Sequence, residues 1–333
     1  MKIVIDCDIP YIRGVFEPYA EVAYIAGSDI TADDVRDADA LIVRTRTRCD
    51  AALLAGSSVR IVSTATIGTD HIALDWCAEA GIRVASAAGC NARGVLQWVA
   101  AALVHLCCKL GRTPEELTLG VVGVGHVGSL VAHYAERWGF DVLRCDPPRQ
   151  EVEGGDFVTL DEVLTHSDII TLHTPFTRTG GHPTAGMIDA EAIARMRPEA
   201  VLLNSARGGI VDERALLASK HIFALDTWVG EPNLDAEVLA AAELSTPHIA
   251  GYSRQGKATA TRMACEAVAV ALDLPAVFNS PVPPTDVRDI SWDELCAIVS
   301  RYFDIDAESR ALKDEPRLFE QMRNHYAYRQ EFF

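Results

Sequence analysis

The 333-residue sequence predicts an α/β protein with two doubly wound domains, each built on a parallel sheet. Short, continuous apolar runs alternate with helical stretches along most of the chain, as in strands that helices cover on both faces. The apolar stretch 94–110 separates two such series and ends at Gly111, a residue typical of helix ends. A chain of this length also exceeds what one compact core usually serves, so we expect two cores.

The apolar runs locate the expected strands. They are Lys2–Asp6, Ala40–Arg44, Arg60–Thr64 and Arg83–Ala85 in the first series, and Leu119–Val124, Asp141–Cys145, Asp168–Leu172, Ala200–Asn204 and Ile222–Asp226 in the second. Because strands alternate with helices, we expect parallel pairing with right-handed crossovers.

The helical stretch Lys257–Leu272 could return the chain to the first domain, which would make that domain discontinuous. We therefore expect a first domain of residues 1–92 plus 256–275 and a second domain of residues 93–255. Residues 280–333 would form a small C-terminal segment, which is too short for an independent core.

The C-terminal segment begins after a Pro-rich linker, 279–284, and contains two helical stretches near 292–302 and 316–325. We expect it to pack on the body of the protein or on another subunit. One oddity lies at Leu216–Phe223, where a helix meets the next strand with almost no connection. Either that loop is very tight or residues are missing there.

Composition excludes several classes of protein. A net charge of −17 disfavours nucleic acid and anionic membranes as partners. The sequence shows neither a run of about 20 apolar residues nor a signal peptide, so we expect a cytoplasmic protein. Nine cysteines without metal-ligand spacing are expected to be reduced thiols, and we expect no metal site.

A glycine-rich turn follows the strand expected at 119–124 and has the spacing G-x-G-x-x-G. Gly123 permits the tight turn, Gly125 lets the backbone approach a pyrophosphate, and Gly128 allows close packing of the next helix on the strand. The helix expected at 127–138 would direct its N-terminus at the phosphates. The alternative is a glycine-rich turn without a ligand, but the flanking strand and helix favour a Rossmann dinucleotide site.

The next strand ends in Asp146, 18 residues after Gly128, near the spacing of the acid that binds the adenosine ribose. A carboxylate there would repel the 2′-phosphate of NADP, so we predict NAD as the cofactor. Arg149 is close in sequence and could soften this preference.

Three further segments follow expected strands, where open α/β sheets bind their ligands. Arg207 precedes two glycines and could grip a carboxylate bidentately, Glu231 lies in a Gly-Glu-Pro turn, and His248 has small and apolar neighbours. Each alone has an ordinary explanation: a surface Arg, a solvated acid, a buried His. Together they supply what hydroxy-acid oxidation needs: a cation for the carboxylate, a base for the hydroxyl proton, and an acid that orients the base.

The segments GVVGVGHVG, NSARGGIVD, WVGEP and TPHIAGY, in this order, resemble those of the D-2-hydroxyacid dehydrogenases, and the resemblance spans about residues 1–272. It implies a Rossmann NAD domain, a flavodoxin-like substrate domain and a cleft. By this resemblance, Arg207 would bind the substrate carboxylate, His248 would be the acid/base and Glu231 would orient it.

The resemblance also implies ligand contacts and an assembly. Thr45, Thr66 and Tyr252 would touch the substrate, and the NAD contacts would include Asp146, Thr174, Asp226 and Gly251. The C-terminal segment would join two chains in a homodimer.

The resemblance further implies a phosphorylated hydroxy acid as the substrate. Arg44 and Arg46 flank Thr45 at the end of an expected strand, and two arginines there could hold a phosphate bidentately. The alternative is that both are surface arginines that offset Asp37 and Asp39. Two other functions stay open: oxidation of 3-phosphoglycerate or of a small 2-hydroxy acid, and NAD sensing by a regulatory protein of the same fold.

Overall fold

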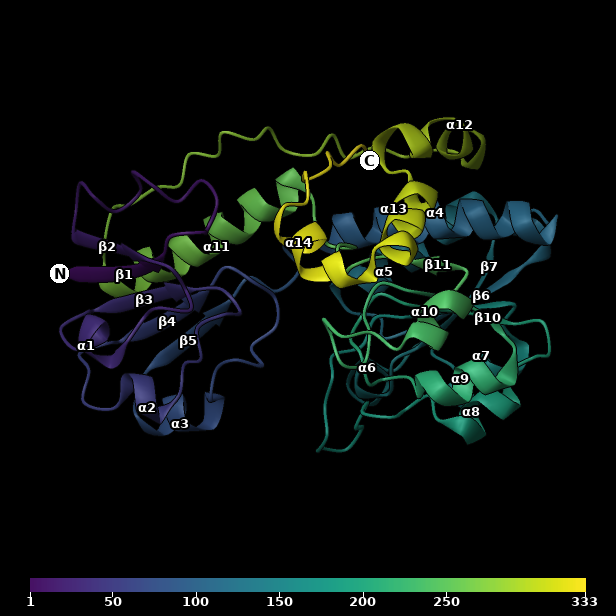
Figure 1. Cartoon of the computed structure of the whole chain (residues 1–333), viewed down its shortest axis with the longest axis horizontal. Helices are drawn as coiled ribbons and strands as arrows, with labels where there is room; N and C mark the ends of the chain where they lie inside the picture. Colours follow the sequence, from purple (N-terminus) through teal and green to yellow (C-terminus); the bar gives the residue numbers. More distant parts are fainter. The chain divides into compact units, whose positions relative to one another are not determined.

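The computed structural model describes all 333 residues, and the chain divides into two compact units (Figure 1). Unit 1 comprises Met1–Asn91 and Ser253–Thr285, and unit 2 comprises Ala92–Tyr252 and Asp286–Phe333.

Unit 1 is a five-stranded parallel sheet in the order β2-β1-β3-β4-β5. Its strands are β1 (Lys2–Asp6), β2 (Glu21–Ile25), β3 (Ala40–Val43), β4 (Ile61–Thr64) and β5 (Arg83–Ser86). Its helices are α1 (Ala32–Val35), α2 (Ala51–Leu54), α3 (Leu74–Glu79) and α11 (Arg254–Leu272). Numbered along the chain, this order is 2-1-3-4-5, the flavodoxin-like doubly wound arrangement.

Two apolar layers cover the sheet of unit 1. Helix α11 packs on one face, where Ala264 and Val268 join Ile3 and Ile5 in one buried cluster. The opposite face buries Leu41 and others with the side chains of α1 to α3. Alternate residues of β1 therefore face different cores, which is why its sequence is apolar without interruption.

Unit 2 is a six-stranded parallel sheet in the order β11-β10-β9-β8-β6-β7. Its strands are β6 (Thr118–Val122), β7 (Asp141–Cys145), β8 (Ile169–Leu172), β9 (Val201–Asn204), β10 (Ile222–Leu225) and β11 (Leu244–Ser245). Its helices are α4 (Ala92–Leu110), α5 (His126–Trp138), α6 (Pro147–Glu153), α7 (Leu160–His166), α8 (Ala190–Arg195), α9 (Glu213–Ser219), α10 (Ala236–Ala241), α12 (Trp292–Tyr302), α13 (Ile305–Asp314) and α14 (Phe319–Asn324), with 3-10 turns at Pro114–Glu116 and Pro316–Leu318. The chain order reverses between β6 and β8, and this switch point is where such sheets bind ligands.

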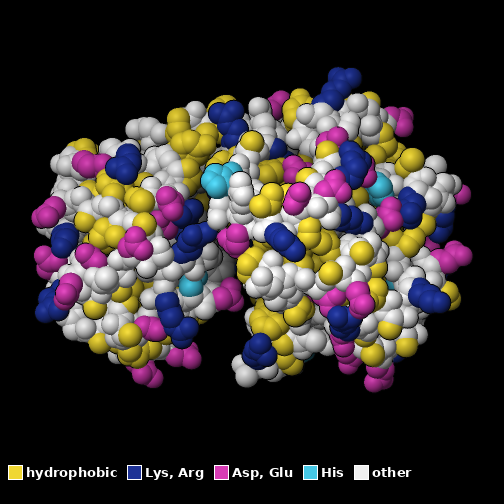
Figure 2. All heavy atoms as spheres, viewed as in Figure 1, with side chains coloured by type: hydrophobic (Ala, Val, Ile, Leu, Met, Phe, Trp, Pro, Cys, Tyr) yellow, Lys and Arg dark blue, Asp and Glu magenta, His cyan; other side chains and the backbone are white.

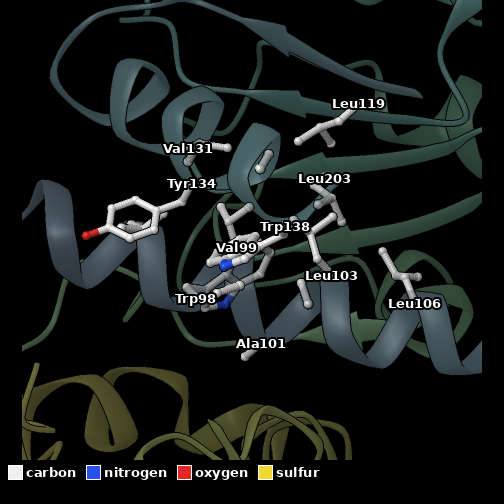
Figure 3. Close-up of a cluster of buried hydrophobic side chains, with 14 of the residues drawn as sticks. Trp98, Val99, Ala101, Leu103, Leu106, Leu119, Val131, Tyr134, Trp138 and Leu203 are labelled. Carbon is white, nitrogen blue, oxygen red and sulfur yellow. The ribbon is translucent and has the colours of Figure 1, made fainter. Parts of the chain in front are cut away.

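The larger core of unit 2 lies between α4, α5 and the sheet (Figure 3). Trp98 and Leu103 of α4 face Val131 and Trp138 of α5 in this cluster. Helix α4 is long and apolar enough to cross a membrane by length and composition, so the expectation that no such stretch exists was wrong. In the folded protein, 67% of the apolar stretch of this helix is buried, as in a helix of the core.

The predicted fold class is confirmed, and each expected strand is present with small shifts of its ends. Two strands were missed. Strand β2 lies at a sheet edge and is only partly buried, and β11 has two residues. The short join at Leu216–Phe223 is a tight loop: Lys220 adopts a left-handed conformation (φ 63°), and only His221 separates it from β10.

The C-terminal segment packs within unit 2. Leu295, Val299, Phe303 and the final Phe333 join the cluster around α4 and α5. Helix α13 was missed because its sequence is mostly polar, although Ile305 and other residues on one face are buried.

On the face shown in Figure 2, acidic and basic side chains are interspersed, without one large basic patch.

Candidate active site

The glycine-rich turn lies between β6 and α5, at the switch point of unit 2. Gly123 has a φ of +85°, and a Cβ there would lie 2.8 Å from the backbone of His173 and Thr174 in the loop after β8. A Cβ on Gly128 would lie 1.9 Å from the carbonyl oxygen of Gly123. At Gly125, a Cβ would meet nothing within 4 Å. Two of the glycines therefore serve packing, whereas the third leaves the backbone open to a ligand.

Asp146 begins α6 directly after β7, and its carboxylate is fixed beside the glycine turn. One oxygen accepts a hydrogen bond from the Val124 amide (2.8 Å), and the other accepts one from the Arg149 amide (3.1 Å). The guanidinium of Arg149 forms a salt bridge with Glu153 (2.6 Å), so its charge is already offset by a carboxylate. This arrangement favours NAD over NADP, because a 2′-phosphate would meet Asp146 without an unengaged Arg149.

Buried hydroxyls mark the ends of the central strands. Thr174 Oγ1, after β8, and Ser205 Oγ, after β9, are buried and have no hydrogen-bond partner within the protein. Because buried polar atoms are nearly always hydrogen-bonded, their position at the switch point indicates that a polar ligand belongs there. The glycine turn, Asp146 and these hydroxyls together fit a dinucleotide.

Glu231 and His248 form a hydrogen-bonded pair in the loops after β10 and β11, which are neighbouring strands. Glu231 Oε2 lies 2.8 Å from His248 Nδ1, and Glu231 Oε1 accepts a hydrogen bond from the Trp228 amide at 2.8 Å. His248 adopts a left-handed conformation with a φ of 57°, an uncommon state for a non-glycine residue that often marks functional sites. The carboxylate therefore fixes the orientation of the imidazole.

Asp226, at the end of β10, holds the loop that carries His248. Its Oδ1 accepts hydrogen bonds from the Thr246 hydroxyl (2.6 Å) and the Ile249 amide (2.8 Å), and its Oδ2 accepts one from the Ala250 amide (2.9 Å). The side chain is buried with both oxygens engaged. Asp226 thus has a visible structural role, and its contact with NAD stays a prediction, as does that of Gly251 in the same loop.

Arg207 lies in the loop after β9, beside the turn that carries Glu231. Asn204 fixes this loop, because its side chain accepts from the Ala206 amide (3.0 Å) and donates to the Arg207 carbonyl (2.9 Å). A Cβ on Gly208 would lie 2.0 Å from the carbonyl oxygen of Trp228, so the two loops are in close contact. The carboxyl ends of β9, β10 and β11 thereby bring the loops of Arg207, Glu231 and His248 to one edge of one sheet.

The environment keeps Glu231 ionised. Burial alone raises its pKa, but the hydrogen bond and charge of His248, the Trp228 amide and the charge of Arg323 together hold the pKa below its usual value. An ionised carboxylate beside the imidazole can stabilise an imidazolium.

Unit 1 contains the other predicted substrate residues. Strand β3 ends at Val43, and Thr45 and Arg46 form an exposed turn directly after it. Arg44 forms salt bridges with Asp6 (3.0 Å) and Asp8 (2.7 Å), acids other than those considered from the sequence. Two carboxylates therefore already compete for Arg44, which makes it a weaker phosphate ligand than the sequence suggests.

Thr66, the remaining predicted substrate residue of unit 1, follows β4. Its hydroxyl lies 2.6 Å from that of Thr64.

Comparison with known proteins decides the family. The model of the D-isomer specific 2-hydroxyacid dehydrogenase NAD-binding domain matches residues 97–250. The erythronate-4-phosphate dehydrogenase of Bacteroides fragilis is 41% identical, over 99% of this chain and 97% of that protein. The chain belongs to the D-2-hydroxyacid dehydrogenases, among the erythronate-4-phosphate dehydrogenases. Relatives with the same name from Ectopseudomonas mendocina (40% identical, 99% and 93% covered) and Escherichia coli (38%, 100% and 92%) agree.

Solved structures of this dehydrogenase family share the fold. A D-lactate dehydrogenase from Aquifex aeolicus, complexed with NAD and lactic acid, matches with a TM-score of 0.65 and 24% identity, covering 82% of this chain and 96% of that one. An NAD-bound 3-phosphoglycerate dehydrogenase from Entamoeba histolytica matches with a TM-score of 0.67 and 24% identity, covering 85% and 99%. The chain is an NAD-dependent 2-hydroxyacid dehydrogenase, as the sequence predicted.

The sequence analysis of this dehydrogenase did not predict the contacts that two arginines of the C-terminal segment make with the loop of His248. Arg329 is buried and donates to the carbonyl oxygens of Ile249 (3.0 Å), Gly94 (2.7 Å) and Ala250. Arg323, on α14, donates from Nε to the hydroxyl of Tyr252 at 3.2 Å. These contacts join residues far apart in the sequence, so only the packing of the segment reveals them.

A third missed residue is Glu213, the first residue of α9. It is 6% exposed and accepts a hydrogen bond from the Val229 amide at 2.7 Å, in the turn that leads to Glu231. Burial raises the pKa of Glu213 to about 7. An acid in the first turn of a helix is common, so its position in the sequence gives no hint of this burial.

Proposed function

We propose that this chain oxidises 4-phospho-D-erythronate at C2 to 2-oxo-3-hydroxy-4-phosphobutanoate, with NAD as the acceptor, in the biosynthesis of pyridoxal 5′-phosphate (vitamin B6). Relatives that share about 40% of its residues over nearly the full length carry the name erythronate-4-phosphate dehydrogenase. The single observation within the structure that supports the chemistry is the pair formed by Glu231 and His248, 2.8 Å apart.

The proposed roles follow from these contacts. The guanidinium of Arg207 binds the substrate carboxylate and holds C2 in place. Because Nδ1 of His248 is held by Glu231, Nε2 is the atom that takes the proton of the C2 hydroxyl. Glu231 stabilises the imidazolium that results. Bound NAD supplies the acceptor for the hydride that leaves C2.

The substrate contacts proposed in unit 1 are Arg44, Thr45, Arg46 and Thr66, and Tyr252 adds one from unit 2. The exposed turn at Thr45 and Arg46 and the hydroxyl of Thr66 support this assignment, whereas Arg44 contributes less because of its acidic partners. The proposed NAD contacts are the glycine turn, Asp146, Thr174, Asp226 and Gly251.

The test is a direct assay. The purified protein is mixed with NAD and 4-phospho-D-erythronate, with 3-phosphoglycerate and D-lactate in parallel, and NADH absorbance is followed. We expect selective turnover of the erythronate ester, and loss of about 10²- to 10⁴-fold in kcat for His248→Asn with unchanged NAD binding. Turnover of another acid would keep the family and discard the substrate. Binding of NAD without turnover of any acid would favour a regulatory protein.

We also propose that the chain works in the cytoplasm as a homodimer, the assembly that the resemblance of the C-terminal segment implies. Light scattering should then give twice the chain mass of 36.1 kDa. A mass of one chain at micromolar concentration would refute the dimer.

A further inference from the structure

Arg323 has a side chain that is mostly buried but partly accessible. Its side chain is 24% exposed, and its Nε donates to the hydroxyl of Tyr252 at 3.2 Å. Tyr326 and Tyr328 pack edge-on against the ring of Tyr252, with centroids 6.1 and 6.0 Å away. The C-terminal segment thus packs around Tyr252, which lies four residues beyond His248 in the same loop.

Glu231 does not require Arg323 as a hydrogen-bond donor. Both of its oxygens are already engaged, one by the Trp228 amide and the other by His248. The carboxylate of Glu320 lies 3.8 Å from Nη1 of Arg323, beyond the length of a good hydrogen bond. The charge of Arg323 nevertheless helps to lower the pKa of Glu231. The hydrogen bond from Arg323 to Tyr252 places this side chain against the loop that carries His248.

A phosphorylated hydroxy acid needs two cationic contacts in a protein whose net charge is −17. Arg207 is proposed for the carboxylate, so the phosphate requires another group. Arg44 is already paired with two acids, and Arg329 is engaged by three carbonyl oxygens. Arg46 keeps its proposed substrate contact in unit 1. Arg323, with a neighbouring hydroxyl that can also contact an anion, meets the requirement better than Arg44 or Arg329.

We infer that Arg323, together with the hydroxyl of Tyr252, binds the phosphate group of the substrate and selects the phosphorylated acid. This inference rests on the proposed function and adds a specificity residue from the C-terminal segment. A guanidinium presents a planar pair of donors that suits a phosphate, and the tyrosine fixes its orientation.

The test compares two substrates in three variants. Arg323→Gln removes the charge but can still donate to Tyr252, Arg323→Lys keeps the charge without the planar fork, and Arg317→Gln changes an exposed arginine nearby as the matched control. Steady-state kinetics are measured with 4-phospho-D-erythronate and with D-erythronate at saturating NAD.

We expect Arg323→Gln to lower the ratio of kcat/KM between the phosphorylated and unphosphorylated acids by about 10- to 100-fold, mainly through KM. Arg323→Lys should lower this ratio less, and Arg317→Gln should have the same ratio as the wild type. Equal losses with both substrates in Arg323→Gln would overturn the inference, because they would indicate a purely structural role.

Inorganic phosphate provides a second readout that does not depend on the identity of the substrate. It should inhibit the wild-type enzyme competitively, with a weaker inhibition constant in Arg323→Gln, whichever hydroxy acid the enzyme oxidises. If the wild type oxidises another acid, the proposed substrate fails, and phosphate inhibition still decides the role of Arg323. Equal inhibition of the wild type and both Arg323 variants would exclude it from the phosphate site.

Discussion

Arg329 donates a hydrogen bond to the carbonyl oxygen of Ile249, 3.0 Å away, and to that of Ala250. The amides of the same two residues donate to Asp226 at 2.8 and 2.9 Å. A buried cation and a buried anion thus hold both sides of the backbone that directly follows His248. The C-terminal segment therefore contributes to the geometry of the proposed acid/base.

Arg329→Met should weaken both stability and activity. Methionine fills part of the space but removes the guanidinium donors, so buried carbonyl oxygens lose a hydrogen bond, at about 1–3 kcal/mol for each one left unpaired. The Ile249 oxygen keeps the Tyr252 amide as a donor at 2.8 Å. We expect urea unfolding to show a loss of about 2–4 kcal/mol in the free energy of unfolding, and kcat to fall while KM for NAD changes little. Arg301→Met, at an exposed position of α12, is the control. If the two variants behaved alike, the hydrogen bonds of Arg329 would not contribute to stability or activity.

Two glycines of the same turn should respond in opposite ways to alanine. Gly128→Ala places a methyl group 1.9 Å from the Gly123 carbonyl oxygen, so α5 must move and thermal unfolding should shift down by several degrees. Gly125→Ala meets no protein atom within 4 Å, so its melting temperature should stay close to that of the wild type while its affinity for NAD drops. Calorimetry and fluorescence titration with NAD separate the two effects. A stable Gly128→Ala protein with normal NAD affinity would contradict the packing argument.

The choice of cofactor should depend on Asp146. Asp146→Ser removes the charge that opposes a 2′-phosphate, so the preference for NAD over NADP, measured as the ratio of kcat/KM, should fall by about tenfold or more. Asp141→Ser changes an exposed acid at the start of β7, the strand that precedes Asp146, and should leave the ratio unchanged. An unaltered preference in Asp146→Ser would mean that another group excludes the phosphate.

Local sequence patterns were enough to predict the strands that form the centre of each sheet. Strands β1, β6 and β8 are mostly buried on both faces, and their nearly continuous apolar sequences indicate this burial. Strand β2 was not predicted because an edge strand needs less apolar surface. Helix α13 was not predicted because its packing depends on three buried positions in a polar sequence.

The candidate site also has one part that the sequence predicts and another that it does not. The glycine turn, Asp146 and the motifs around Arg207, Glu231 and His248 lie directly after strands, so their order in the sequence predicts a common edge of the sheet. The partners of Arg44 and the contacts of Arg329 could not be predicted, because they join residues far apart in the sequence. Those contacts are set by how loops and the C-terminal segment fold onto the sheet, which no local pattern records.

Glu213 should make stability depend on pH near neutrality. Burial raises its pKa from 4.5 to about 7, so between these values the unfolded chain releases a proton that the folded chain keeps. Folding then binds a proton, and stability falls as the pH rises through this window. Above about pH 7, the folded protein carries a buried carboxylate beside the ionised Glu231.

Glu213→Gln removes this titration and preserves an oxygen that can accept from the Val229 amide. Between pH 5 and pH 8, the free energy of unfolding of the wild type should therefore drop by about 2 kcal/mol more than that of the variant. Glu199→Gln, at an exposed position, should follow the wild type. Urea titrations at both pH values measure the difference. If the wild type and Glu213→Gln lose the same free energy over this range, Glu213 is ionised in the folded protein at pH 5, and its burial does not control the pH dependence.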